Sequence, residues 1–212
     1  MSDVEMFDTF NEEMLLIGAD TRANVHAKGL WHQTFHCWIV NQSTIGGTSL
    51  LFQLRHKDKD TYPSLLDISC AGHLQAGESV EDGVRELWEE LGLTTPFSEL
   101  TYCGIVAEEN IISEQCVDRE FNHIFILESD KLVEEYNIQI SEVSGLFYIN
   151  LNLFRKLMSG NRSSILTEGI VIDDENQKLH SVTKEFCIHD FTPMSSHYAE
   201  VLFGNLERMS LA

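Results

Sequence analysis

The chain has 212 residues, of which 43% are apolar and 23% charged, and its formal net charge is −20. The apolar and charged fractions are ordinary for a globular domain, so they exclude a wholly disordered or fibrous protein. A surface this acidic repels the phosphates of nucleic acids and anionic lipids. We therefore expect no nucleic-acid partner and no membrane association.

The distribution of cysteines and the N-terminal residues both bear on the compartment. The five cysteines are scattered along the chain and form no Cys-x-x-Cys pair, which argues against a disulfide framework or a structural zinc site. Met1–Asp8 lacks the basic and apolar regions of a signal peptide, and no apolar run approaches the roughly 20 residues that span a bilayer. These features predict a soluble, cytoplasmic protein.

The first part of the chain is rich in predicted strands. Val4–Asp8 and Met14–Gly18 flank a polar turn and predict a hairpin. Phe35–Val40 and Ser49–Leu54 are β-rich runs joined by a turn that contains glycine, so they predict a second hairpin. Asp67–Cys70 is a short strand candidate that leads into a loop rich in glycine.

Ser79–Leu91 has the strongest helical pattern in the sequence. Ser79 and Asp82 resemble a capping box at the start, and Gly92 supplies a stop. The apolar residues recur at helical spacing and predict one buried stripe, formed by Val80, Val84, Leu87, Trp88 and Leu91.

Further strands and two helices follow. Strands are expected at Leu100–Ala107, Glu120–Leu127 and Gly145–Ile149, then helices at Leu151–Met158 and Ser195–Arg208. The inner face of the last helix is predicted to consist of Tyr198, Val201, Leu202 and Leu206. This order is that of a mixed α/β (α+β) fold with hairpins, and it lacks the βαβ alternation of a Rossmann sheet.

No Gly-, Ser- or Pro-rich linker divides the chain, so we expect one domain over residues 1–212. Its predicted parts are an N-terminal hairpin over 1–20, a core over about 30–160 and a C-terminal helical extension over 161–212. Leu151–Ala212 carries no specific motif, and helices there could cover the sheet, wall a substrate site or form a homodimer contact.

The predicted helix carries a cluster of carboxylates. Glu86, Glu89 and Glu90 are related as i, i+3 and i+4, so they crowd onto one face and repel one another unless a cation lies among them. A set of oxygen ligands suits Mg²⁺ or Mn²⁺ better than zinc. The loop Gly72–Glu78 can approach the same ion closely, because it has glycine near both ends. An acidic face alone would more often be merely solvated, but its conjunction with this loop and with Arg85 favours a metal site.

The segment from Gly72 to Leu93 resembles the Nudix box, which reads Gly, five residues, Glu, seven residues, then Arg-Glu-apolar-x-Glu-Glu-x-Gly-apolar. The matching residues are Gly72, Glu78, Arg85, Glu86, Leu87, Glu89, Glu90, Gly92 and Leu93. One departure stands out, because six residues instead of seven separate Glu78 from Arg85. The shorter spacing threatens the contact of Glu78 with the helix and leaves the Arg-Glu-x-x-Glu-Glu core whole.

The resemblance implies a Nudix fold, a mixed sheet sandwiched between helices, and Mg²⁺- or Mn²⁺-dependent hydrolysis of a diphosphate linkage in a small nucleoside diphosphate-type substrate. It also implies roles for single residues. Glu86, Glu89, Glu90 and the Gly72 carbonyl would ligate metal, while Arg85 would orient a neighbouring carboxylate. A carboxylate outside the box often serves as base or extra ligand in this family. Glu120 is the first candidate for that role, and Asp118 is the second.

The likeness extends to the isopentenyl-diphosphate isomerase-like branch of the family, over roughly Val4–Ile149. By this resemblance Arg55 and Lys59 would hold the substrate diphosphate, with His73 as a further substrate contact. The isomerase also has a metal site, and the residues that match it are His32, His73, Asp118 and Glu120, with His26 near the position of another.

Three functions stay open at this point. The isomerase has its catalytic Cys where this chain has Ala71, and Cys70 lies one place early, on the opposite face of a strand. Isomerases also carry an eroded Arg-Glu-x-x-Glu-Glu core, so hydrolysis is preferred to isomerisation. The third function is that of a catalytically weak domain that binds a nucleotide and regulates a partner, and the shortened box favours it.

Overall fold

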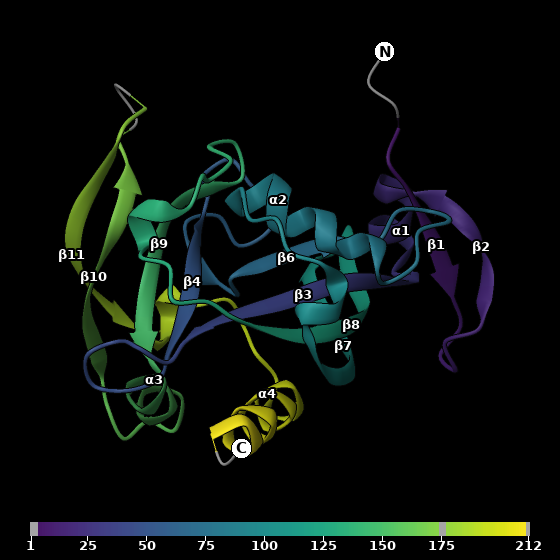
Figure 1. Ribbon diagram of the computed structural model, residues 1–212. Coiled ribbons are helices and arrows are strands. Elements are labelled where there is room, and N and C mark those ends of the chain that lie inside the picture. The colour runs from purple at the N-terminus through teal and green to yellow at the C-terminus, as the bar shows by residue number, and fades with distance from the viewer. Residues whose placement is uncertain (1–3, 174–176, 211–212) are drawn as a thin grey trace.

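The protein, seen in a computed structural model that describes residues 4–173 and 177–210, is built on one sheet of eleven strands (Figure 1). The strands are β1 (Met6–Phe10), β2 (Leu16–Thr21), β3 (Trp31–Asn41), β4 (Ser49–Arg55), β5 (Leu66–Asp67), β6 (Cys70–His73), β7 (Thr101–Ser113), β8 (Cys116–Glu128), β9 (Val143–Asn150), β10 (Ser164–Ile172) and β11 (Leu179–Cys187). The helices are α1 (Arg22–Lys28), α2 (Arg85–Leu91), α3 (Leu151–Met158) and α4 (Ser196–Ser210), and 3₁₀ turns occur at η1 (Asp82–Val84), η2 (Phe97–Glu99), η3 (Val133–Glu135) and η4 (Ile188–Asp190).

Strand β3 organises the sheet. It runs parallel to β8 over Trp31–Val40, and its other edge is shared by β1, β6 and β4, all antiparallel to it. Its side chains alternate between two apolar cores, because Phe35, Cys37 and Ile39 point to one face and Trp38 and Val40 to the other. A strand buried on both faces needs the nearly continuous apolar run that this segment has.

Helices cover both faces of the sheet (Figure 1). Helix α2 packs Leu87 and Leu91 into one core, while α3 and α4 pack Phe154, Tyr198 and Leu202 into the other. The predicted mixed α+β sandwich is therefore confirmed. Among the described residues, no helix is long and apolar enough to cross a membrane.

Most of the predicted strands are present, with differences in pairing. Strands β1 and β2 form the predicted N-terminal hairpin. Strands β3 and β4 pair only through Val40 with Leu50 and Asn41 with Ser49, because β4 then diverges to pair with β9 along its length. The predicted strand at Asp67–Cys70 is divided into β5 and β6, which pair with β4 and β3 respectively.

The predicted helix Ser79–Leu91 begins later than expected. Residues Asp82–Val84 form the 3₁₀ turn η1, and the α-helix starts at Arg85. A Cβ added to Gly83 would lie 2.6 Å from the Cβ of Phe35, so this turn packs directly against β3. Asp82 accepts hydrogen bonds from the backbone and hydroxyl of Ser79, as expected. Gly92 ends the helix in a left-handed conformation (φ 63°).

One buried position and one stretch of secondary structure differ from prediction. Trp88 is 63% exposed, so it lies outside the predicted buried stripe. The region 161–212 is also not wholly helical, because Ser164–Ile172 and Leu179–Cys187 pair as the antiparallel hairpin β10–β11 and extend the sheet beyond β9. The β-branched residues of Ser-Ile-Leu-Thr-Glu-Gly-Ile-Val-Ile favour this strand, and its Gly169 is required because a Cβ there would lie 2.3 Å from the Leu146 carbonyl oxygen.

Candidate functional site

A cavity of about 300 Å³ opens between α2, the strands β6 and β8, and the loop that joins β4 to β5. Its lining is strongly acidic, with nine carboxylates against four cationic side chains. The carboxylates are Glu5, Asp67, Glu86, Glu89, Glu90, Glu108, Asp118, Glu120 and Glu142, and the cations are Arg22, Arg55, Lys59 and Arg85. So many like charges in one cavity favour the binding of cations.

Helix α2 presents its three carboxylates to this cavity with different burial. Glu86 and Glu90 are 9% and 6% exposed, whereas Glu89 is exposed. The pKa of Glu86 is raised from 4.5 to about 7, mainly because the carboxyl group is buried. Burial and the neighbouring charge of Glu86 raise the pKa of Glu90 from 4.5 to about 8. These two groups would be neutralised by protons or by a bound metal ion.

Glu90 is oriented by polar contacts beneath the cavity. Its Oε2 accepts hydrogen bonds from Gln53 Nε2 and from the Ala71 backbone amide, both at 3.3 Å. Gln53 comes from β4 and Ala71 from β6, so two strands hold the carboxylate at the base of the helix. A buried carboxylate with two donors is fixed in position before any ligand arrives.

At Gly72, β6 lies close against the side chain of Glu86 on α2. A Cβ at residue 72 would lie 2.1 Å from Cδ of Glu86 and 2.3 Å from its Oε1, so no larger residue fits without displacing that carboxylate. The Gly72 backbone therefore lies beside Glu86, as the prediction of a carbonyl ligand requires.

Arg85 binds the loop that precedes the helix. Its Nε donates to Glu78 Oε1 at 2.8 Å, and its Nη2 donates to Glu78 Oε2 and to the His73 carbonyl, both at 3.0 Å. This fork-to-fork geometry is the strongest that a guanidinium makes with a carboxylate. The contact between Glu78 and the helix is thus made despite the shortened spacing. The 3₁₀ turn η1 helps, because it rises about 2.0 Å per residue against 1.5 Å in an α-helix.

Arg85 also reaches two of the helix carboxylates. Its Nη1 donates to Oε1 of Glu86 and, at 3.3 Å, to Oε2 of Glu89. The second oxygen of each of these carboxylates accepts no hydrogen bond within the described part of the chain. Two of the three helix carboxylates are therefore partly engaged by one arginine.

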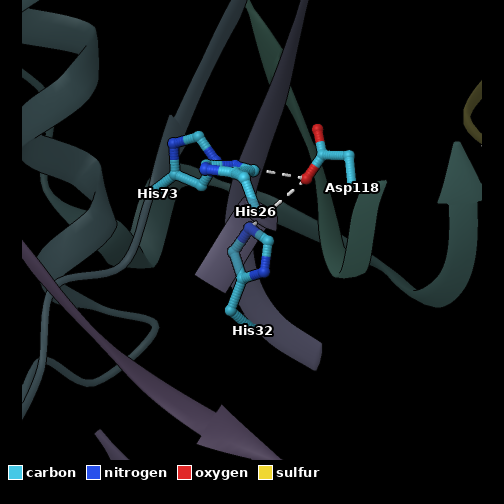
Figure 2. Close-up of side chains that lie close together, drawn as sticks. All are labelled: His26, His32, His73 and Asp118. Carbon is cyan, nitrogen blue, oxygen red and sulfur yellow. Dashed lines mark ion pairs between the residues drawn. The ribbon is translucent and has the colours of Figure 1, made fainter. Parts of the chain in front are cut away.

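A second group of ligand-type side chains lies close together (Figure 2), and two of them, His73 and Asp118, line the cavity. One ligand atom from each of His26, His32, His73 and Asp118 lies within 4.8 Å of the others. The Nε2 atoms of His26 and His32 both lie 3.5 Å from Asp118 Oδ1. Glu120 borders the group, with its Oε1 3.5 Å from His73 Nε2. This set is called the His–Asp cluster below.

The rings of the His–Asp cluster are oriented for ligation. The Nδ1 atoms of His26 and His32 lie 2.9 Å and 3.0 Å from the carbonyl oxygens of Arg22 and Leu30. Nδ1 therefore carries the proton in each ring and donates it to the carbonyl oxygen. Each Nε2 is then unprotonated, and its lone pair faces the centre of the His–Asp cluster. The Nε2 atoms of His32 and His73 and Oδ1 of Asp118 are buried and have no hydrogen-bond partner among the residues that the structure describes. Buried polar atoms are rarely left unsatisfied, so this donor set fits a metal ion.

The N-terminal hairpin closes the His–Asp cluster from one side. The ring of Phe7, from β1, stacks on His73 and His32 with centroid separations of 4.6 Å and 5.4 Å. Phe7 is fully buried. Burial lowers the pKa of His32 and His73, so both rings stay neutral and available as ligands at neutral pH.

Both predicted phosphate-binding cations face the cavity and are already paired. Arg55 Nη1 donates to Asp67 at 2.6 Å. Lys59 forms an ion pair with Glu142. Arg22, which the sequence analysis did not single out, also lines the cavity and lies 3.0 Å from Glu5.

The C-terminal segment forms part of the wall. Thr192 and Pro193 line the cavity, and the hydroxyl of Tyr198 on α4 lies 3.0 Å from Nδ1 of His36 beneath it. The amide of Ser195 donates to Glu108 at 3.2 Å. This region therefore covers one face of the sheet and lines part of the cavity.

Cys70 faces away from the cavity. It is fully buried in the core beneath α2, in register with Cys37 of β3, whereas Ala71 lines the cavity. Burial raises the pKa of the Cys70 thiol well above its usual value of 9.0. Such a thiol neither reaches a substrate in the cavity nor ionises at neutral pH, which argues against the isomerase reaction.

Comparison with known proteins identifies the family. The NUDIX domain matches residues 30–167, a stretch that holds Gly72, α2 and most of the cavity wall. A Clostridium acetobutylicum protein named as an uncharacterized Nudix hydrolase is 40% identical over 202 residues, which are 95% of this chain and 97% of that protein. The chain belongs to the Nudix family. The predictions of this family and of an enzyme that hydrolyses diphosphate bonds are confirmed at that level.

Other relatives of this Nudix protein carry more specific names. Nudix hydrolase 3 of Arabidopsis thaliana is 30% identical over 170 residues, 78% of this chain but 21% of that protein. Isopentenyl-diphosphate Delta-isomerase 2 of Photorhabdus laumondii is 31% identical over 144 residues, 68% of this chain and 76% of that protein. A crystal structure of a Deinococcus radiodurans protein superposes with a TM-score of 0.55 at 20% identity, covering 74% of this chain and 90% of that one, and supports the fold.

The Nudix helix and the His–Asp cluster bring together most of the residues that the sequence singled out. Arg85, Glu86, Glu89, Glu90, Gly72 and Glu120 all line one cavity. Phe7 was missed, because an apolar residue in a hairpin carries no signal of its contact with distant histidines. Tyr62, on the loop between β4 and β5, was also missed, and its backbone conformation is visible only in the structure.

Proposed function

We propose that the protein hydrolyses a phosphoanhydride bond in a small nucleoside diphosphate-type substrate, with dependence on Mg²⁺ or Mn²⁺. The observation that supports this most strongly is the cavity itself. Nine carboxylates line it, and each of its four cationic side chains is already paired with one of them. A diphosphate is excluded from such a cavity unless divalent cations accompany it.

Two sets of residues would hold these cations. Glu86, Glu89, Glu90 and the Gly72 carbonyl offer only oxygen, which suits Mg²⁺ or Mn²⁺. The His–Asp cluster offers three imidazoles and a carboxylate, a mixture that favours a transition metal. Bound cations neutralise charge on the diphosphate and make water a better nucleophile near neutral pH.

Glu120 is our candidate for the general base. Burial and the nearby charges of Asp118, Glu108 and Asp67 raise the pKa of Glu120 well above its usual value, which strengthens it as a proton acceptor. In the proposed reaction its carboxylate takes a proton from the attacking water as oxygen attacks phosphorus. The bond to the bridging oxygen breaks and a phosphate leaves in line.

Arg55, Lys59 and His73 line the cavity, and we assign them roles other than holding the diphosphate directly. Arg55 and Lys59 contribute positive charge to the cavity through pairs that also fix its wall. We assign His73 to the His–Asp cluster instead of to direct substrate binding, because its buried Nε2 has no hydrogen-bond partner in the described ranges 4–173 and 177–210.

A substrate panel tests the proposal. Nucleoside diphosphate compounds and isopentenyl diphosphate are incubated with the protein and Mg²⁺ in ¹⁸O-labelled water, and products are read by mass spectrometry. We expect Mg²⁺-dependent release of a phosphorylated product with label on one phosphorus. Binding without turnover across the panel would instead support the regulatory function. Conversion of isopentenyl to dimethylallyl diphosphate would support isomerisation.

A further inference from the structure

The loop between β4 and β5 contains two residues in a rare backbone conformation. Tyr62 and Ser64 have φ angles of 48° and 63°, in the left-handed region, and Pro63 lies between them. This conformation is unfavourable for a bulky residue, and a following proline restricts it further. Such strain persists only where surrounding contacts impose it, and it is concentrated at functional sites.

Arg55 and Lys59 supply those contacts. The Nε and Nη2 of Arg55 donate to the Thr61 carbonyl at 3.1 Å and 2.9 Å, and Nη2 donates also to the Thr61 hydroxyl at 3.1 Å. The remaining nitrogen of the Arg55 guanidinium, Nη1, donates a hydrogen bond to Asp67. Lys59 pairs with Glu142, which lies on a turn beyond the loop. The residues that immediately precede Tyr62 are therefore held in place before any ligand binds.

Tyr62 lines the cavity and carries a hydroxyl donor. Its hydroxyl makes no hydrogen bond with any residue that the structure describes. Burial and the charges of Asp118, Glu120 and Asp67 raise the pKa of Tyr62, so the phenol keeps its proton at neutral pH. A neutral donor beside so many carboxylates can serve an anionic ligand without competing for the cations.

We propose that Tyr62 is a substrate-binding residue, whose hydroxyl donates a hydrogen bond to a non-bridging oxygen of the bound diphosphate. This rests on the proposed function and adds to it a contact outside the Nudix box. The strained loop, fixed by Arg55, holds the phenol in place, so that little ordering is needed when the substrate enters.

Tyr62→Phe tests the contact because it removes one oxygen and keeps the ring. Methylenediphosphonate, a diphosphate analogue that cannot be hydrolysed, is titrated calorimetrically into the protein at saturating Mg²⁺. We expect the Kd to rise by about 10- to 100-fold, as for a lost hydrogen bond to a charged acceptor, with an unchanged Tm. Tyr102→Phe is the matched control, because this phenol is 54% exposed on β7 and outside the cavity lining.

The outcomes separate this inference from the proposed function. A Kd for Tyr62→Phe equal to that of the wild type overturns the role of Tyr62, even where the wild type hydrolyses a substrate of the panel. Failure of the wild type to bind methylenediphosphonate with Mg²⁺ also overturns it. The proposed function, in contrast, fails where no member of the panel releases a phosphorylated product.

Discussion

Replacing Glu90 by glutamine is expected to lower kcat by about 10²- to 10⁴-fold, since a lost metal ligand removes several kcal/mol of charge stabilisation from the transition state. The substitution keeps the oxygen that accepts from Gln53 and Ala71, so the fold is retained. Mg²⁺ at about 100 times its Kd should raise the Tm of the wild type by roughly 5–10 °C. That shift should nearly vanish in Glu90→Gln.

Glu81→Gln is the control for this variant. Glu81 is exposed, immediately precedes η1 and does not line the cavity. It changes the net charge by the same amount, so it reports any effect of charge alone. Equal losses in the two variants, or full activity of Glu90→Gln, would contradict the assignment of Glu90 as a ligand.

The metal-free protein is expected to lose stability as the pH rises from about 6.5 to 8. Glu86 and Glu90 have pKa values of about 7 and about 8 when folded, against 4.5 ordinarily. The folded state therefore binds more protons than the unfolded state between these values, and the free energy of unfolding falls with pH. Because each group loses about 1.4 kcal/mol per pH unit until its folded pKa is reached, the expected loss over this interval is roughly 1 kcal/mol for Glu86 and roughly 1.5 kcal/mol for Glu90.

Two other features bear on this pH profile. The lowered pKa values of His32 and His73 act in the opposite direction, but only below about pH 6.5, where unfolded histidine takes up protons. Saturating Mg²⁺ should flatten the decline, because the metal replaces the protons on the carboxylates. Denaturant unfolding at a series of pH values, with and without Mg²⁺, measures both effects. A metal-free stability that stays constant or rises over this interval would contradict the burial of these two charges.

The carboxylate group on α2 was predictable because its residues lie close together in the sequence. The i, i+3 and i+4 spacing of Glu86, Glu89 and Glu90 places them on one helix face whatever the rest of the chain does. The helix start was less predictable, since the close packing of Gly83 on Phe35 is a tertiary contact. The part played by Arg85 between two carboxylates likewise depends on rotamers that no pattern reveals.

The His–Asp cluster could be found in the sequence only through family resemblance. His26 lies on α1, His32 on β3, His73 on β6 and Asp118 on β8, and these elements meet because β3 pairs with both β6 and β8. Long-range strand pairing of this kind has no local signal. The β10–β11 hairpin was missed for another reason, because its strand pattern was present and the C-terminal region was expected to be helical.

Manganese anomalous diffraction tests most directly whether the carboxylates of α2 hold a cation. Crystals soaked with Mn²⁺ and methylenediphosphonate should show an anomalous peak within ligand distance of Glu86, Glu90 and the Gly72 carbonyl. The soaked crystals should also show Oε1 of Glu86 turned away from Arg85. Diphosphonate in the cavity with no peak beside α2, and with Glu86 and Glu89 still on Arg85, would contradict the account.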